Sequence, residues 1–230
     1  MQNSSFHLRL GISAVLKATV RALIVAGIIP IVLMHSVSYC GAYENDIGKI
    51  RGELESMRKE DHDKYRDFRY ALRHIRSVNK RQREITSVLV AKAVADEVHG
   101  KRYRYASFEH RLNFLSVIMG IIKVESGFNP DAVSGKNARG LMQVHWPTWK
   151  QYFSSQEEVH DLNRNLSAGA AILRLYMMRS NNDLRTALYK YLGAKDDRYA
   201  DRVIASAIAF KKSVLSDPIK DDFGRQGSIR

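Results

Sequence analysis

Residues 125–148, ESGFNPDAVSGKNARGLMQVHWPT, decide the fold that we expect for this chain. The apolar run LNFLSVIMGIIKVE leads into them with helical spacing, and Glu125 falls on its apolar face, two turns beyond Ile118. Gly127 and Pro130 stand where a helix is capped and stopped. The sequence therefore predicts a helix that ends near Glu125 and turns this carboxyl group towards the core.

The position of Glu125 predicts a carboxylic acid with a raised pKa. Burial disfavours the charged form, and the negative end of the helix dipole repels it. An acid that is still protonated near neutral pH can donate its proton to a leaving oxygen, which glycoside cleavage requires. Taken alone, the same position also suits a structural acid whose hydrogen bonds are satisfied.

The motifs around Glu125 resemble those of the soluble lytic transglycosylase family. The resemblance covers roughly residues 110–205 and does not extend to residues 1–84. It rests on Glu125-Ser126, Gly140-Leu141-Met142-Gln143, Pro147-Thr148, the helix start from Asn165 to Gly169, and Tyr199 with Val203.

This resemblance implies an all-α, lysozyme-like domain that cleaves peptidoglycan between N-acetylmuramic acid and N-acetylglucosamine. Glu125 would protonate the glycosidic oxygen and then act as base on the C6 hydroxyl, closing a 1,6-anhydro ring without a second carboxylate. Ser126 would orient the acid or only cap the helix end, and Gln143 would bind an N-acetyl group. Tyr191 would hold sugar or the Glu125 carboxyl. The implied substrate-binding residues are Ser126, Met142, Gln143 and Tyr191, and no metal or cofactor is implied.

One position departs from the family pattern. Tyr191-Leu192-Gly193-Ala194 stands where the family usually has Tyr-Asn-x-Gly, so Leu192 replaces an amide. Two alternatives therefore stay open: a muramidase of the same fold that uses water, and a non-catalytic wall-binding scaffold. Trp146 and Trp149 either line a sugar groove or belong to the core.

Composition narrows the class of protein further. The chain has 230 residues, of which 45% are hydrophobic and 27% charged, as expected for a folded protein. Its net charge of +13 favours a polyanionic partner. The single cysteine, Cys40, excludes an internal disulfide and a cysteine-built metal site.

Residues 1–42 predict that the protein is located in the cell envelope. They contain no acidic residue, and the apolar run ALIVAGIIPIVLM occupies residues 22–34. We expect a single-pass anchor in the inner membrane, with a cleaved signal peptide as the alternative. The positive-inside rule then places the catalytic domain in the periplasm. A phage-encoded protein of this kind would be associated with the virion instead.

Residues 43–84 predict a charged helical stalk with coiled-coil-like spacing. A single helix from Ile47 to Leu89 would reach ~64 Å. An amphipathic helix folded back onto the domain is the equally weighted alternative. The stalk would allow self-association, or docking to an envelope-spanning or virion complex. Residues 85–216 then form the catalytic domain, and residues 217–230 a polar tail.

A basic stretch lies between Arg69 and Arg83. Nucleic-acid binding is conceivable there, but export past a membrane argues against it, so no nucleic-acid partner is expected. A solvated helix face that attracts anionic lipid or cell-wall polymer is favoured instead.

Overall fold

The computed structural model describes residues 46–219. The predicted anchor or signal peptide in residues 1–42, and the tail beyond residue 219, lie outside this range. Within it, no helix combines the length and the apolar character that crossing a bilayer requires. The chain divides into two units, Met1–Ser56 and Met57–Arg230, and the second contains every element discussed below.

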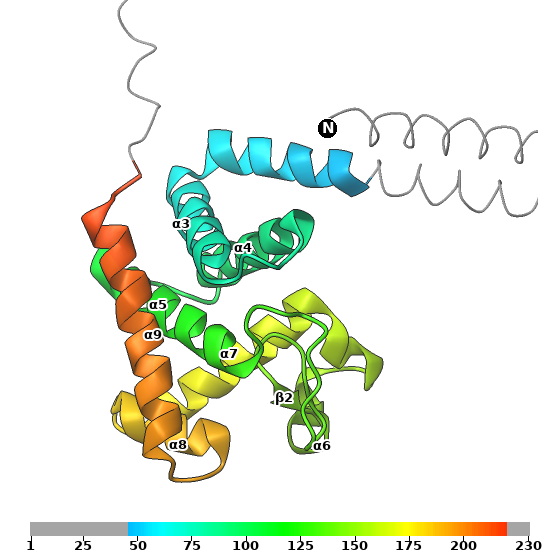
Figure 1. The fold of residues 1–230 in the computed structure, drawn as a ribbon, viewed down its shortest axis with the longest axis vertical. Coiled ribbons are helices and arrows are strands. Elements are labelled where there is room, and N and C mark those ends of the chain that lie inside the picture. The colour runs from blue at the N-terminus through cyan, green and yellow to red at the C-terminus, as the bar shows by residue number, and fades with distance from the viewer. Residues whose placement is uncertain (1–45, 220–230) are drawn as a thin grey trace, which may run out of the picture. The chain divides into compact units, whose positions relative to one another are not determined.

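The second unit is built mainly from helices, in agreement with the predicted all-α class (Figure 1). One of them, α5, covers the apolar run LNFLSVIMGIIKVE from which the sequence predicted a helix. Most begin at a side-chain cap: Asp61, Ser107, Asp161, Asp183 and Asp196 each accept a hydrogen bond from a backbone N–H in the first turn. The helices are α3 (His62–Val78), α4 (Glu84–Val98), α5 (Phe108–Glu125), the short α6 (Trp146–Trp149), α7 (Leu162–Met178), α8 (Leu184–Leu192) and α9 (Asp197–Ser216).

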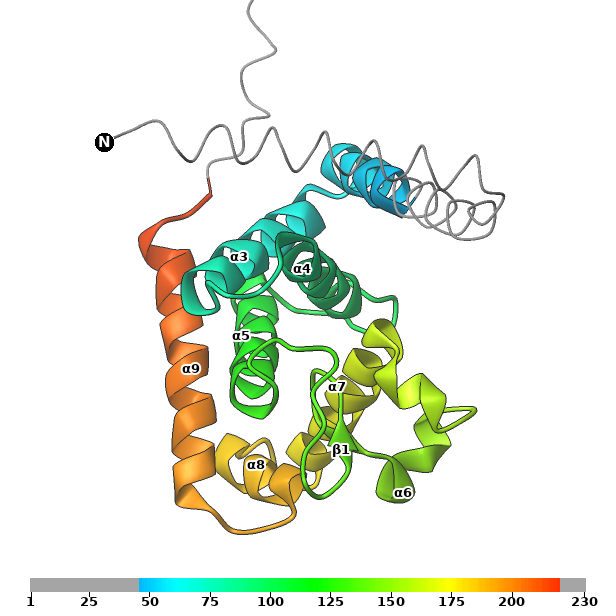
Figure 2. The same ribbon diagram turned by 45° about the vertical axis from the view of Figure 1, so that its right-hand side comes forward.

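The central helix α5 packs lengthwise against α9 (Figure 2). Gly120 permits this close approach, because a Cβ atom there would lie 2.6 Å from the carbonyl oxygen of Val203. Lys211 near the end of α9 bonds Asn113 near the start of α5, with 2.7 Å between Nζ and Oδ1. The two helices are therefore antiparallel, and the start of α9 meets the end of α5.

Helix α3 belongs to the folded unit and not to an extended stalk. Phe68, Ala71 and Ile75, which follow the predicted coiled-coil spacing, are all buried, and α3 packs against α4 and α9. For residues 62–78 the structure thus shows the folded-back alternative. The side chain of Asp61 caps the start of α3 by accepting a hydrogen bond from the Lys64 N–H at 2.9 Å.

The chain also forms a small β-hairpin that the sequence pattern did not predict. Strand β1 (Ala138–Arg139) pairs antiparallel with β2 (Val144–His145), and residues 140–143 make the turn. Strands of two residues are too short to show alternating hydrophobicity. This hairpin carries the Gly-Leu-Met-Gln motif, so it is the feature that positions part of the site.

Candidate active site

Glu125 is the last residue of α5, as the sequence predicted. Gly127 and Phe128, which follow the helix cap, both have left-handed backbone conformations, with φ of 59° and 69°. Burial of the carboxyl group raises the pKa of Glu125, and this effect outweighs a hydrogen bond from Tyr199 and the charge of Arg202, which both lower it. The raised pKa is the property that a proton donor needs.

The phenol of Tyr199 is the direct partner of the Glu125 carboxyl. Its hydroxyl donates a hydrogen bond of 2.6 Å to Oε1 of Glu125. Tyr199 lies in the first turn of α9 and is buried, so the antiparallel packing of α5 and α9 brings the two groups together. A phenol in this place stabilises the carboxylate that forms once Glu125 has given up its proton.

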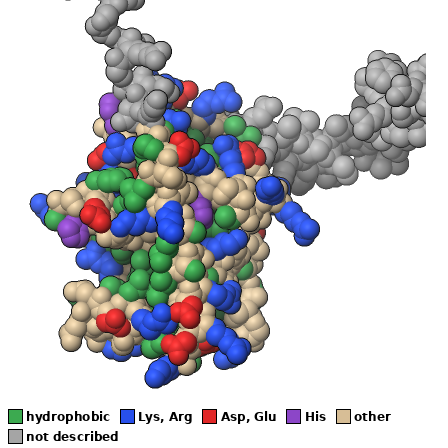
Figure 3. Space-filling model, turned by 60° about the vertical axis from the view of Figure 1, so that its left-hand side comes forward, with side chains coloured by type: hydrophobic (Ala, Val, Ile, Leu, Met, Phe, Trp, Pro, Cys, Tyr) green, Lys and Arg blue, Asp and Glu red, His purple; other side chains and the backbone are tan. Residues whose placement is uncertain are grey.

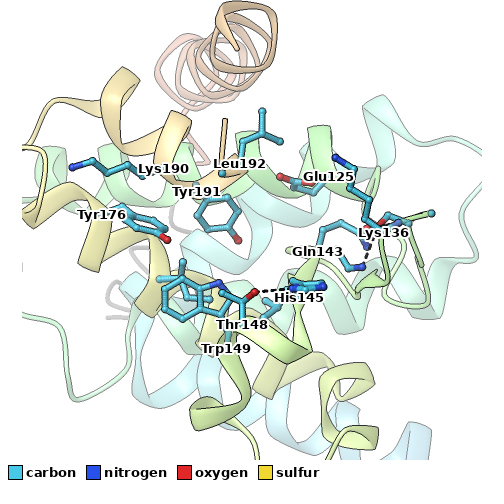
Figure 4. A pocket seen from close by; sticks show the side chains of 16 residues that line it. Glu125, Lys136, Gln143, His145, Thr148, Trp149, Tyr176, Lys190, Tyr191 and Leu192 are labelled. Atoms are coloured by element: carbon cyan, nitrogen blue, oxygen red, sulfur yellow. Dashed lines mark hydrogen bonds between the residues drawn. The ribbon is translucent and has the colours of Figure 1, made fainter. Parts of the chain in front are cut away.

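Glu125 lines a cavity of about 520 Å³ (Figure 4). This volume lies within the range of small-ligand sites. The hairpin, α6, α7 and α8 supply the other walls, and the polar groups of Gln143, Thr148 and Tyr191 come from three of these elements. Glu125 is the only acidic residue among those that line the cavity.

Gln143 lines the cavity, and its side-chain amide is held by the loop. Its Nε2 donates to the carbonyl oxygens of Ala132, at 3.0 Å, and Gly140, at 2.9 Å, so both amide hydrogens are used within the loop. The oxygen can still accept a hydrogen bond, for example from the N–H of an N-acetyl group. The left-handed backbone of Gln143, with φ of 48°, directs the side chain into the cavity wall.

The side chain of Met142 packs inside the protein and does not line the cavity. It is fully buried, and Gly169 makes room for it, since a Cβ there would lie 2.5 Å from Met142. Its backbone N–H donates to Oδ1 of Asn165 at 2.9 Å. The Asn165 amide also donates to the carbonyl oxygens of Arg139 and Val159, and this side chain therefore fixes the hairpin to α7.

Tyr191 lies in the cavity wall beside Leu192 (Figure 4). Its hydroxyl donates to the backbone carbonyl of Met142 at 2.9 Å. The hydroxyl that bonds Glu125 comes from Tyr199, so of the two roles expected for Tyr191, contact with sugar is the one this arrangement suits. Leu192 is 39% exposed, although a leucine gains by burial, and it forms part of the same wall.

Ser126 does not line the cavity. Its Oγ donates to the carbonyl oxygen of Ile122 at 3.1 Å, which is the helix-end role named as its alternative. Trp149 does line the cavity and meets Tyr176 edge-on, at 5.8 Å between ring centroids. Trp146 instead packs against Phe153 at 5.9 Å.

Sequence reasoning did not assign roles to Tyr199, Thr148 and Tyr176. Tyr199 and Thr148 belong to the quoted motifs, so the motif match was the signal that could have found them. Thr148 lines the cavity and forms a 2.7 Å hydrogen bond with Nδ1 of His145. Tyr176 carries no such signal, because an aromatic residue in α7 reads equally well as core.

No second acid completes a carboxylate pair in this cavity. Asp131, the nearest acid in the sequence, is exposed, and its backbone N–H donates to Oδ1 of Asn129 at 3.0 Å in a turn. Across residues 46–219, no three His, Cys, Asp or Glu side chains form a group that could hold a metal ion. Among the residues that line the cavity, Glu125 is the one carboxylic acid available for proton transfer.

Comparisons with known proteins concern the same part of the chain. Residues 109–201, from α5 to the first turns of α9, match the family model of the Transglycosylase SLT domain. This part of the chain thus has the class of domain to which the fold and the site point.

Two curated relatives carry related names. Membrane-bound lytic murein transglycosylase C of Haemophilus ducreyi is 34% identical over 129 residues, covering 49% of this chain and 35% of that protein. The transglycosylase of Enterobacteria phage PRD1 is 36% identical over 77 residues, covering 34% of this chain and 28% of its own length. The matched part thus spans about a third of each relative. No solved structure matches the chain significantly.

Proposed function

We propose that this protein is a peptidoglycan lytic transglycosylase that cleaves between N-acetylmuramic acid and N-acetylglucosamine and closes a 1,6-anhydro ring. One observation carries the proposal: Glu125, whose carboxyl is desolvated enough to raise its pKa, is the only acid among the residues that line a ligand-sized cavity. A hydrolase with two carboxylates needs a second acid on the opposite side of the sugar ring. Internal attack by the C6 hydroxyl needs only one group that gives and then takes a proton.

The proton balance of this reaction closes on Glu125. The protonated carboxyl donates its proton to the glycosidic oxygen as the bond from that oxygen to C1 of N-acetylmuramic acid breaks. The resulting carboxylate, held by the Tyr199 hydroxyl, then accepts the proton of the C6 hydroxyl as O6 bonds to C1. Glu125 ends the cycle protonated, the N-acetylglucosamine leaves with a free 4-hydroxyl, and no water is consumed.

The remaining cavity residues suit the binding of a glycan strand. Gln143 offers an acceptor for an acetamido N–H, and the rings of Trp149 and Tyr191 offer surfaces for sugar rings. Ser126 acts at the helix end and Met142 supports the wall from inside. These assignments support binding of the glycan backbone across the hairpin, α6 and α8.

The test is mass spectrometry of purified peptidoglycan after incubation with the full chain, beside the Glu125→Gln variant. We expect anhydro-muropeptides from the wild type and at least a ~1,000-fold lower yield from the variant, because glutamine cannot donate the proton. Reducing-end products would instead identify a muramidase. Absence of any product together with retained glycan binding would support a scaffold.

We also propose that residues 1–42 anchor the protein in the inner membrane and that the catalytic domain lies in the periplasm. The basic, acid-free segment with its apolar run supports this proposal. Local opening of the cell wall, during phage entry or assembly of an envelope-spanning machine, is the role that such an anchor suits. Membrane fractionation of the full chain and of a chain lacking residues 1–42 tests it, and sedimentation of the shortened protein with membranes would contradict it.

The surface of the second unit is compatible with an anionic polymer nearby. Figure 3 shows Lys and Arg side chains spread over the face it presents, with hydrophobic side chains between them. Some cations of the basic stretch are used within the fold: Arg73 pairs with Asp217 at 2.7 Å, and Arg76 pairs with Glu84. These ion pairs support a structural role for part of the basic stretch. They do not support a dedicated nucleic-acid site.

A further inference from the structure

The turn that follows Glu125 is fixed by contacts with residues outside α5. Gly127 and Phe128 adopt left-handed conformations in succession, and only glycine does so without strain. For a phenylalanine such a conformation is strained and persists where the surroundings enforce it. The side chain of Phe128 is fully buried, and its ring meets His74 of α3 edge-on.

Two amide side chains of the α3–α4 loop bind the carbonyl groups of this turn. Asn79 Nδ2 donates to the oxygen of Gly127 at 2.7 Å, and Gln82 Nε2 donates to the oxygen of Phe128 at 2.7 Å. The two amides are also joined, because Asn79 Nδ2 donates to Gln82 Oε1 at 3.0 Å. Together Asn79 and Gln82 form a connected amide clamp on consecutive carbonyls.

We propose that the amide clamp of Asn79 and Gln82 positions Glu125 for proton transfer. The inference rests on the proposed function and concerns residues outside the matched Transglycosylase SLT domain, which begins at residue 109. Asn79 and Gln82 do not line the cavity, so they act on the reaction through Glu125.

The physical reason lies in the end of α5. A carbonyl in the last turn of a helix has no partner further along the helix, so the backbone after it is fixed by other contacts. Glu125 sits in that last turn, and its carboxyl must stay 2.6 Å from the Tyr199 hydroxyl on another helix. A displacement of about 1 Å at a catalytic group can lower the rate ~100-fold.

The clamp can be tested because its two residues carry no charge. The charged and titratable groups near Glu125 include Tyr199 and Arg202 on α9 and Tyr191 on α8, and Lys136 lines the same cavity from the loop before β1. Removal of two neutral amides changes the Glu125 pKa only through the position and solvation of the carboxyl. A clamp with a purely structural role would lower stability and leave the Glu125 pKa of the folded protein unchanged.

The experiment compares wild type, Asn79→Ala/Gln82→Ala and Gln82→Met in the full chain. Methionine preserves the length of Gln82 without its donor and protects the test if the double variant folds poorly. The Glu125 pKa is measured by carbon-13 NMR of the side-chain carboxyl, and kcat and KM are measured on peptidoglycan. Arg73→Ala is the matched control, because it removes hydrogen bonds of α3 to the carbonyls of Ser213 and Asp217 and none to Gly127 or Phe128.

We expect the clamp variants to lower the Glu125 pKa by at least about half a unit, because the carboxyl gains solvent. We expect kcat to fall about tenfold or more, with KM within about twofold. Arg73→Ala should lower the melting temperature and leave both the Glu125 pKa and kcat unchanged. An unchanged pKa and kcat in both clamp variants would overturn the proposal. A pKa shift in a protein whose wild type yields no product would refute the proposed function and leave the positioning role standing.

Discussion

Tyr199 and Glu125 are 74 positions apart in the sequence and are joined by a hydrogen bond of 2.6 Å. The bond spans the antiparallel pair α5 and α9, at the end where α5 stops and α9 begins. It is a contact between a catalytic candidate and a buried phenol whose pKa is itself raised by burial and by the nearby Glu125. Tyr199 therefore stays protonated, and able to donate this hydrogen bond, well above neutral pH.

Replacing Tyr199 by phenylalanine should lower kcat by roughly tenfold to a hundredfold, because the carboxylate intermediate loses its donor. The hydrogen bond lowers the Glu125 pKa, so its removal raises that pKa further. Activity requires protonated Glu125 and declines as pH rises through its pKa, so the alkaline limb of the kcat profile should move to higher pH. Tyr189→Phe, which removes a phenol–Asp197 bond outside the cavity, serves as control. A shift of the limb to lower pH would contradict this role.

Leu192→Asn should give turnover at least equal to that of the wild type. Leu192 lines the cavity and is 39% exposed, so an amide at this place loses little burial and can bond a sugar hydroxyl. Steady-state kinetics on peptidoglycan measure the effect. Leu215→Asn is the matched control, because Leu215 is 59% exposed on α9 and does not line the cavity. A drop in kcat/KM of Leu192→Asn alone would show that the leucine itself contacts the substrate.

Asn165→Ala should destabilise the folded protein by about 3 kcal/mol or more, since buried groups left without partners cost about 1–3 kcal/mol each. Asn165 is buried, and it bonds one N–H and two carbonyl groups of the hairpin and its neighbourhood. Urea unfolding measures the change. Asn113→Ala loses only an exposed contact with Lys211. It should therefore lower the free energy of unfolding by well under about 1 kcal/mol, as surface substitutions do. Equal losses in the two variants would argue against the hairpin anchor.

Stability should decline as pH falls below about 6.5, and His74 contributes to the decline. Burial and the charge of Lys123 lower the pKa of His74 to about 4. The unfolded chain binds this proton below its ordinary pKa of 6.5, whereas the folded protein does not until about pH 4. The stability present above pH 6.5 is therefore lost between these values, by up to about 3 kcal/mol.

The variant His74→Phe should flatten this pH dependence. Its ring fits the same edge contacts with Phe128 and Phe210, and it has no proton to bind. Thermal unfolding between pH 4 and pH 7 compares it with the wild type. An identical slope in both proteins would assign the acid sensitivity to other groups.

The sequence predicted the positions of the helices and of the candidate acid, Glu125, because both depend on local signals. The end of α5 at Glu125 follows from Gly127 and Pro130, and the helical segments follow from apolar periodicity. The raised Glu125 pKa also followed from its place on an apolar face. Family motifs added Gln143 and Tyr191, which both line the cavity.

Other features depend on contacts between distant segments, which a single sequence does not encode visibly. The bond from Tyr199 to Glu125 requires the relative register of α5 and α9, which Gly120 helps to set. The amphipathic face of α3 fits a coiled coil and a domain surface equally well, because both need the same spacing. The amide clamp joins segments more than forty positions apart and has no motif of its own.

Under the proposed anchoring of residues 1–42, the docking of α3 on the domain also sets how far from the membrane the active site can lie. Because α3 and its loop belong to the second unit, only residues 43–56 separate the proposed anchor from that unit. As a helix, this linker of residues 43–56 spans about 21 Å, which is a third of the length expected for a full stalk. A longer linker, and not a higher kcat, is then the change that would extend cleavage to more distant layers of the wall.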